Sequence, residues 1–214
     1  MHVGRWYGRV LGIAVALAMV MLAAQPARAG APSDQLRTQI ERVLKVLDDA
    51  GLKKEAKARD RRVEVRKIAE DIFDFSETAK RSLGRHWAQR SQGEKDEFVS
   101  LFADLLERSY ISKIELYGGE KIAYTGDSID GDQASVRTKI VTKQGSEIPI
   151  EYRMLKKGDR WLVYDVIIEG VSLVSNYRTQ FNKIIQTSSF QELVKKMKTK
   201  QEEFLGDEKS RRTS

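Results

Sequence analysis

The sequence predicts an α+β domain: a curved, antiparallel meander of four strands, with helices before and after it in the chain. Three observations predict this class. Apolar residues recur at helical spacing from residue 33 to 117, alternate with polar residues from 121 to 168, and return to helical spacing after 173. Helices that flank such a meander typically pack over one face of the sheet. We therefore expect helices on one face, enclosing an apolar cavity.

The first 29 residues have the pattern of a secretory signal peptide. Arg5 and Arg9 precede an apolar run at residues 10–24, and Ala27-Arg28-Ala29 matches an A-x-A cleavage site. The run is shorter than the roughly 20 residues of a membrane-spanning helix, so cleavage after Ala29 is favoured over an uncleaved anchor. We expect one domain at residues 30–205 and a disordered basic tail at residues 206–214.

The composition excludes several functional classes. Removal of residues 1–29 takes away three arginines and no acidic residue, which lowers the net charge from +7 to +4. An exported, mildly basic protein is not expected to bind nucleic acid, but it suits anionic lipid or an acidic protein surface. The absence of cysteine excludes disulfides, thiolate metal sites and a lipid anchor. His86 is the one histidine beyond the signal, so no metal and no cofactor are expected.

The helices before the sheet are predicted at residues 33–50, 54–72, 77–83 and 91–117. Ser33 is the expected cap of the first helix, and Gly51 ends it. Ser91 and Glu94 form a capping box at the start of the fourth helix. The apolar stripe of this helix runs as far as Tyr117, and its periodicity cannot distinguish a core helix from one that lines a cavity.

The four strands are predicted at residues 121–128, 136–142, 148–154 and 161–168, joined by short turns. The fourth is apolar on both faces, which is typical of a strand covered on both sides. Its register is ambiguous, because side chains alternate between the two faces of a sheet. Either Trp161, Val163 and Asp165 point inward, or Leu162, Tyr164, Val166 and Ile168 do. We favour Val166 and Ile168 opposite Ile150 and Ile148.

Asp165 is the strongest candidate for a catalytic residue. A carboxylate buried in a strand has a raised pKa and could act as a general base. The alternative is a structural role, in which Asp165 pairs with Arg153, Arg137 or a backbone amide. We favour the structural role, because a base needs a second polar group nearby and the neighbouring strand residues are aliphatic.

The run from Trp161 to Val174 reads Trp-Leu-Val-Tyr-Asp-Val-Ile-Ile-Glu-Gly-Val-Ser-Leu-Val, and Asn176-Tyr177-Arg178 and Gln180-Phe181 follow it. Together with Asp74-Phe75, Leu83-Gly84, Trp87, residues 98–106 and Ser109-Tyr110, this run resembles the MlaC (toluene-tolerance) family of periplasmic phospholipid-binding proteins. The resemblance extends from about residue 35 to residue 204. The charged second helix and the basic tail fit it less clearly.

The resemblance implies a carrier that shuttles phospholipid across the periplasm and is not an enzyme. Its partners would be phospholipid as cargo, an inner-membrane ABC transporter complex with MCE domains, and an outer-membrane lipoprotein complex. In such a carrier the acyl chains lie between sheet and helices, while the headgroup stays near solvent. This agrees with the apolar cavity expected from the residue pattern.

The candidate lipid-binding residues follow from face and position, and they come from the long fourth helix, strands two to four and the strand-to-helix junction. They are Leu105, Tyr110, Ile140, Ile150, Tyr152, Met154, Val166, Ile168, Val171, Leu173, Val174 and Tyr177. Arg178 either lies at the mouth near a phosphate or is an ordinary solvated arginine. Two alternatives to a carrier stay open: a small periplasmic enzyme that uses Asp165 as general base, and a scaffold with a solid core and no ligand.

Overall fold

The computed structural model describes residues 31–213, apart from the side chains of residues 55, 205 and 207–213. The expected signal peptide and its cleavage site at Ala29 lie outside these residues. Within 31–213, no helix is both long and apolar enough to cross a membrane.

Six α-helices occur in the described chain, and all of them were expected from the apolar periodicity. They are α1 (Pro32–Asp48), α2 (Ala58–Ile72), α3 (Phe75–Leu83), α4 (Gln92–Glu115), α5 (Leu173–Thr187) and α6 (Phe190–Thr213). The capping box of Ser91 and Glu94 is present at the start of α4. The predicted cap at Ser33 is wrong: α1 begins one residue earlier at Pro32, whose fixed φ suits the first helical position.

The last helix is longer than the residue pattern indicated. A disordered basic tail was expected from Gly206, whereas the backbone of α6 is helical as far as Thr213. A glycine inside a helix costs only about 1 kcal/mol relative to alanine, so Gly206 does not by itself end a helix. The charged residues around it, which gave no apolar stripe, are mostly good helix formers.

The sheet has five strands in the order β1-β2-β3-β4-β5, all antiparallel to their neighbours. They are β1 (Lys121–Asp130), β2 (Gln133–Val141), β3 (Glu147–Lys157), β4 (Arg160–Ile168) and β5 (Val171–Ser172). The prediction of four strands missed β5. Glu169 and Gly170 both have positive φ, as in the tight turns of two-residue hairpins, and they fold Val171 and Ser172 back onto β4.

A β-bulge in β4 resolves the ambiguous register. Val163 pairs with Met154 and Asp165 pairs with Arg153, so Tyr164 is the extra residue between them. Trp161 and Val163 therefore share a face with Val166 and Ile168, and each of the two alternative registers is right for one half of the strand. The favoured pairing is wrong by two residues, because Ile168 lies opposite Ile150 and Val166 opposite Tyr152.

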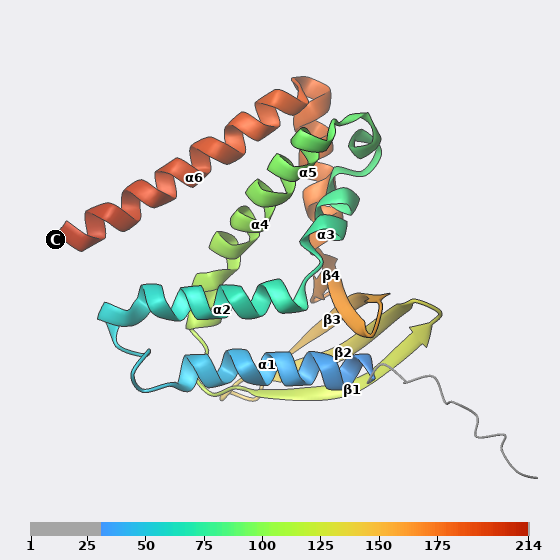
Figure 1. Cartoon of the computed structure of the whole chain (residues 1–214). Helices are drawn as coiled ribbons and strands as arrows, with labels where there is room; N and C mark the ends of the chain where they lie inside the picture. Colours follow the sequence, from blue (N-terminus) through green and yellow to red (C-terminus); the bar gives the residue numbers. More distant parts are fainter. Residues whose placement is uncertain (1–30, 214) are drawn as a thin grey trace, which may run out of the picture.

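The helices form two groups around this sheet (Figure 1). Helices α1 and α2 pack on one face, here called the inner face, where Leu36 and Ile72 join Val136 and Val163 in one buried cluster. Helices α3 to α6 build a second cluster around Phe98, Phe102 and Phe181. The class of fold is confirmed, but α4 and α6 stand away from the sheet, and the helices do not all cover one face.

Strand β4 is covered on both sides, as its apolar sequence predicted. Its inner face contributes Val163 to the cluster with α1 and α2. On the other side, the Thr78 hydroxyl of α3 donates to the Tyr164 carbonyl at 3.0 Å, and the Arg81 guanidinium lies 4.0 Å from the centre of the Tyr164 ring. This strand therefore joins the two helical groups.

Candidate functional site

The inner face of the sheet is apolar and is packed unevenly from one end to the other. At the end next to the β3–β4 turn, Ala134, Met154 and Val163 are buried beneath α1 and α2. At the opposite end, the cross-strand pair Ile140 and Ile148 is only half-buried. The sheet thus has a tightly packed end and a loosely covered end.

The loosely covered surface is larger than this one pair. Hydrophobic side chains that border the inner cluster but remain partly exposed come from α1, from β1 to β4, from the link between α2 and α3, and from the start of α5. They are Ile40, Val43, Val46, Phe73, Tyr124, Ile140, Ile148, Tyr152, Ile168 and Leu173. We call this set the half-buried apolar surface. It can contact a ligand that has no polar groups, because pockets for such ligands are lined mainly by hydrophobic side chains.

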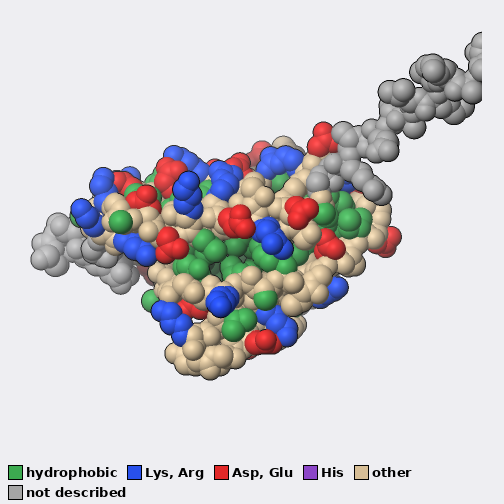
Figure 2. Space-filling model, turned by 90° about the horizontal axis from the view of Figure 1, so that it is seen from below, with side chains coloured by type: hydrophobic (Ala, Val, Ile, Leu, Met, Phe, Trp, Pro, Cys, Tyr) green, Lys and Arg blue, Asp and Glu red, His purple; other side chains and the backbone are tan. Residues whose placement is uncertain are grey.

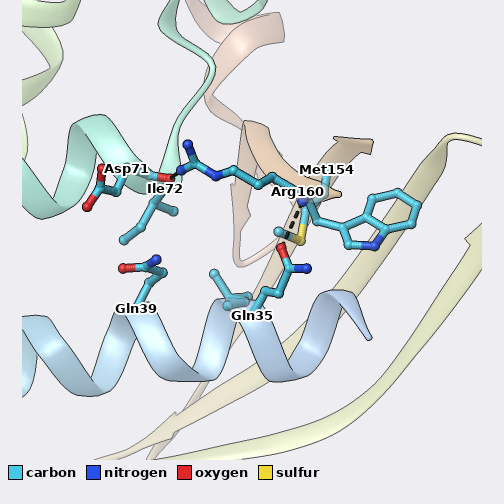
Figure 3. Close-up of a pocket in the computed structure, with 8 residues that line it drawn as sticks. Gln35, Gln39, Asp71, Ile72, Met154 and Arg160 are labelled. Carbon is cyan, nitrogen blue, oxygen red and sulfur yellow. Dashed lines mark hydrogen bonds between the residues drawn. The ribbon is translucent and has the colours of Figure 1, made fainter. Parts of the chain in front are cut away.

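The space beside the tightly packed end is small (Figure 3). A hollow of about 20 Å³ lies among Leu36, Ile72, Met154 and Trp161. Gln35 closes it by accepting a 2.9 Å hydrogen bond from the Trp161 amide, and Arg160 donates to the Asp71 carbonyl. Room of this size suits about one water molecule, so the predicted cavity is not formed here as a chamber for an acyl chain.

Figure 2 shows the molecule from below, on the side of α1 and the sheet. Hydrophobic side chains gather there in a hollowed central strip, and Lys, Arg, Asp and Glu side chains border it. An apolar strip with a charged border is a common feature of surfaces that bind apolar ligands or protein partners.

One face of α5 connects the two apolar clusters. Leu173 borders the inner cluster, whereas Tyr177, one turn later, borders the helical cluster. The Tyr177 ring packs edge-on against Phe102 at 5.0 Å, and its hydroxyl lies 3.5 Å from that of Ser109. Tyr110 is half-buried, and burial, with the nearby Tyr177 phenol, raises its pKa. Leu173, Tyr177 and Tyr110 therefore lie where the two clusters meet.

The structure does not bring all of the predicted lipid-binding residues together. Those on the inner face or next to it are Ile140, Ile150, Tyr152, Met154, Val166, Ile168 and Leu173. Leu105 and Tyr177 border the helical cluster instead. Val174 is buried at the start of α5, and Val171 is exposed on β5. Helical spacing placed Leu105 on an apolar stripe, but it could not show which of two clusters that stripe joins.

Asp165 has the structural contacts that were favoured for it. The residue is 4% exposed; Oδ2 accepts from the Ser172 hydroxyl at 2.7 Å, and Oδ1 accepts from the Val174 amide at 3.0 Å. Arg153 lies 3.8 Å from Oδ2. Both oxygens are thus engaged in holding the start of α5 against β4.

Arg178 also has a structural contact. Its Nε donates to the Arg81 carbonyl at the end of α3, at 2.8 Å. Elsewhere, no three acidic or histidine side chains between residues 31 and 213 come together as a metal site, within the side chains that are described.

The residue pattern predicted no function for two of the side chains on the inner face. The hydroxyls of Tyr124 and Thr138 are buried there and have no hydrogen-bond partner. Thr138 stands opposite Tyr124 on the neighbouring strand. The available signal was a threonine at an inward position of a strand whose other inward residues, Val136 and Ile140, are aliphatic.

Comparisons of this chain with known protein families and with known proteins agree with one another. The model of the MlaC protein family matches residues 37–199. The intermembrane phospholipid transport system binding protein MlaC of Haemophilus influenzae is 25% identical over 120 residues, which are 54% of this chain and 56% of the relative. The toluene tolerance protein ttg2D of Pseudomonas putida is 29% identical over 83 residues, 35% of this chain and 39% of the relative. The matched stretches thus span about half, or less, of these curated relatives.

The fold resembles a solved structure of a phospholipid-binding protein from Ralstonia solanacearum in complex with a phospholipid. The TM-score is 0.69, with 24% identity, over 78% of this chain and 95% of that one. At this identity the likeness establishes the fold. The family match covers more than half of the chain, from α1 to α6. This chain belongs to the MlaC family.

Proposed function

We propose that this protein is a periplasmic carrier that binds phospholipid acyl chains against the half-buried apolar surface and shuttles lipid between the inner and outer membranes. The observation that carries the proposal is that surface: α1 and α2 bury one end of the inner face and leave Ile140, Ile148 and Ile168 partly exposed at the other. Relatives described as phospholipid-binding or as part of intermembrane phospholipid transport support it.

The energetics of lipid in water explain why a carrier needs such a surface. Transfer of about 30 methylene groups from an apolar phase to water costs roughly 24 kcal/mol, at about 0.8 kcal/mol per group. The carrier must cover most of both chains with apolar side chains to offset this cost. It must not bind lipid much more tightly than a bilayer does, because it would then not release its cargo.

Binding of acyl chains at the inner face also requires more space than the hollow at Trp161 provides. Ligand pockets typically measure about 300–1,000 Å³, against about 20 Å³ for the hollow at Trp161. Acyl chains would therefore displace side chains of α1 from the loosely covered end, where fewer fully buried contacts oppose the movement. An inner-membrane ABC transporter complex with MCE domains and an outer-membrane lipoprotein complex would be the partners that load and unload the carrier.

The test is lipid extraction and native mass spectrometry of the protein purified from a periplasm. We expect co-purified phospholipid, and uptake from vesicles of phosphatidylethanolamine and phosphatidylglycerol. Ile148→Glu, on the half-buried apolar surface, should abolish uptake, because an ionised carboxylate there opposes apolar chains. Ile129→Glu is the matched control, since Ile129 is 56% exposed, and it should leave uptake unchanged.

Two results would contradict the proposal. Apoprotein alone from the periplasm, with no uptake from vesicles even when the partner complexes are supplied, would favour a scaffold with a solid core. Equal lipid content in Ile148→Glu and Ile129→Glu would show that lipid binds elsewhere on the molecule.

A further inference from the structure

The inner face of the sheet carries three hydroxyl groups among hydrophobic side chains. Tyr124 on β1 stands opposite Thr138 on β2, and Tyr152 on β3 lies diagonally from Thr138 on the same face. The inward direction of Thr138 follows from the alternation along β2, where Val136 is 0% and Thr138 2% exposed, while Arg137 is exposed. We call Tyr124, Thr138 and Tyr152 the hydroxyl cluster.

Two of these hydroxyls lack hydrogen bonds. The Tyr124 hydroxyl and Thr138 Oγ1 are both buried, and neither has a partner. Thr138 lies near enough to Tyr152 to oppose the rise of its pKa, but the two form no hydrogen bond of good geometry. A buried polar group without a partner costs free energy and is rare in native proteins. A pair of them on one apolar surface indicates that a polar group of a ligand belongs there.

The protonation of the phenols determines what kind of group fits. Burial raises the pKa of Tyr124 to about 12, and the neighbouring Tyr152 phenol adds to this rise. Burial likewise raises the pKa of Tyr152 to about 12. All three hydroxyls therefore carry a proton at neutral pH and can donate hydrogen bonds. The complementary ligand group is a neutral acceptor, because the surrounding aliphatic side chains disfavour an unpaired charge.

The position of the cluster fits the polar middle of a diacyl lipid. Tyr124 lies on β1 at the edge of the sheet, and the guanidinium of the exposed Arg37 of α1 lies 4.3 Å from the centre of its ring. Along the inner face, the half-buried pair Ile140 and Ile148 follows the hydroxyl cluster towards the loosely covered end. A bound lipid would follow this order: its headgroup would face solvent near Arg37, its ester groups would lie at the hydroxyl cluster, and its acyl chains would lie on Ile140 and Ile148.

We propose that the hydroxyl cluster of Tyr124, Thr138 and Tyr152 binds the ester carbonyl groups of a diacylglycerophospholipid. This inference rests on the proposed carrier function and adds a polar subsite to it. It implies that the protein distinguishes ester-linked chains from chains of equal length that lack carbonyls. It implies no headgroup preference, because Glu41 lies near Tyr124 as well as Arg37.

The experiment offers the purified chain two lipids in one vesicle preparation. Dioleoylphosphatidylglycerol and its diether analogue share headgroup and chains and differ in the two carbonyls. Native mass spectrometry then gives the ratio of the two lipids bound. We expect the wild type to prefer the diester roughly tenfold, as one or two net hydrogen bonds would give.

The variants remove the hydroxyls with little change of shape. Thr138→Val and Tyr124→Phe, singly and together, should lower the preference for the diester towards one. Their urea midpoints should stay at or above the wild-type value, because an unpartnered hydroxyl is removed. Ser135→Ala is the matched control: it also removes a buried, unpartnered hydroxyl, but from the opposite face of β2. It should keep the full preference.

The outcomes separate this inference from the carrier function. Lipid uptake with equal binding of diester and diether, or a preference that survives in the double variant, would overturn the ester subsite and leave the carrier function intact. Displacement of the diester by equimolar oleate would assign the hydroxyls to a carboxylate and likewise overturn it. A wild type that takes up no lipid at all would overturn both.

Discussion

The amide of Val174 donates a 3.0 Å hydrogen bond to Oδ1 of Asp165. The second oxygen of this buried carboxylate accepts from the Ser172 hydroxyl, and the same hydroxyl accepts from the Ser175 amide at the N-cap of α5. One strand residue thus completes the start of a helix that the chain reaches after a tight turn. The contact explains how α5, which runs from the inner cluster into the helical cluster, is held in a fixed relation to β4.

Replacement of Asp165 should therefore affect stability. Asp165→Ala leaves the Val174 amide and the Ser172 hydroxyl without their partner, so we expect a loss of about 2–3 kcal/mol in the free energy of unfolding. Asp165→Asn keeps one acceptor oxygen and should lose less. Urea denaturation measures both, with the exposed Asp127→Ala as control. If Asp165→Asn kept wild-type stability but lost a measurable turnover, the enzyme alternative would replace the structural role.

The helices α2 and α4 are joined by charged side chains whose pKa values predict a pH dependence. Glu115 of α4 binds Arg61 and Arg62 of α2 at 2.8 Å and 3.0 Å, and its side chain is 12% exposed. Burial opposes its ionisation, but the hydrogen bonds from Arg62 and Arg61 outweigh burial and hold the pKa of Glu115 below its ordinary value of 4.5. A carboxyl whose pKa is lowered by folding stabilises the fold fully at pH values above its pKa in the unfolded chain. This contribution is lost as the pH falls through its lower pKa in the folded protein.

Glu115→Gln should therefore lower the free energy of unfolding by about 1–3 kcal/mol at pH 7. It should also reduce the loss of stability that the wild type shows as pH falls below 4.5. Urea titrations between pH 3 and 7 measure both effects. Lys53→Gln removes an exposed ion pair with Asp48 and serves as control. Parallel pH profiles for the wild type and Glu115→Gln would contradict the assignment.

Glu107 should show the opposite sign. Burial raises its pKa above 4.5, and Asp104 and Glu70 add to this rise, whereas Arg66 and Arg108 act against it. A carboxyl with a raised pKa makes the fold more stable as pH falls through that pKa. Glu107→Gln should thus leave the free energy of unfolding at pH 7 unchanged or slightly higher. It should also remove the gain in stability that the wild type shows as the pH falls. A clear destabilisation at pH 7 would show that its ion pair with Arg66 outweighs burial.

Arg178 should be a structural residue and not a ligand for phosphate. Its Nε caps the end of α3 through the Arg81 carbonyl, and its side chain passes Gly84, where an added Cβ would lie 3.5 Å from Cδ. Arg178→Lys loses the directed bond and should cost about 0.5–1 kcal/mol of stability with unchanged lipid uptake. A selective loss of uptake of anionic lipid would instead show that Arg178 lies at the mouth of the site, near a phosphate. Gly84→Ala should cost about 1–3 kcal/mol, because φ +57° with ψ −129° is a conformation that residues other than glycine rarely adopt.

The sequence predicted the six α-helices of the described residues and the four long strands, because each has an apolar period. The bulge at Tyr164 could not be predicted in this way. The run from Trp161 to Ile168 is apolar on both faces, so a shift of one residue leaves its pattern almost unchanged. The pairing with β3 determines where the extra residue lies. Strand β5 was missed for a related reason: its two residues are too few to show a period.

The candidate site was predicted in part. Alternation along β2 and β3 correctly placed Ile140, Ile150 and Tyr152 on the inner face. The sequence could not predict which cluster α4 joins, because an apolar stripe fits either cluster equally well. In the structure Leu105 borders the helical cluster. Whether these residues touch lipid stays a prediction. The hydroxyl cluster was missed because a single threonine in a strand is ordinary, and only the absence of a partner makes Thr138 informative.

Asp74 and Lys157 allow a last test of how α3 is attached to the sheet. Asp74 is the N-cap of α3: Oδ1 accepts from the Glu77 amide at 3.0 Å, and its own amide donates to the Val163 carbonyl at 2.8 Å. Oδ2 has no hydrogen bond of good geometry, but it lies against the Lys157 ammonium as an ion pair. The carboxylate is 6% exposed, whereas Lys157 is 53% exposed.

This geometry predicts that the cap matters more than the ion pair. Asp74→Ala loses both and should cost about 2 kcal/mol, whereas Asp74→Asn keeps the cap and should cost less. Lys157→Met should cost under about 1 kcal/mol, because its ammonium remains half in water. In a double-mutant cycle of Asp74→Asn with Lys157→Met, measured by urea denaturation, the coupling energy should stay below about 1 kcal/mol. A larger coupling would mean that the buried carboxylate depends on Lys157, and the ion pair would then be the main attachment of α3 to the sheet.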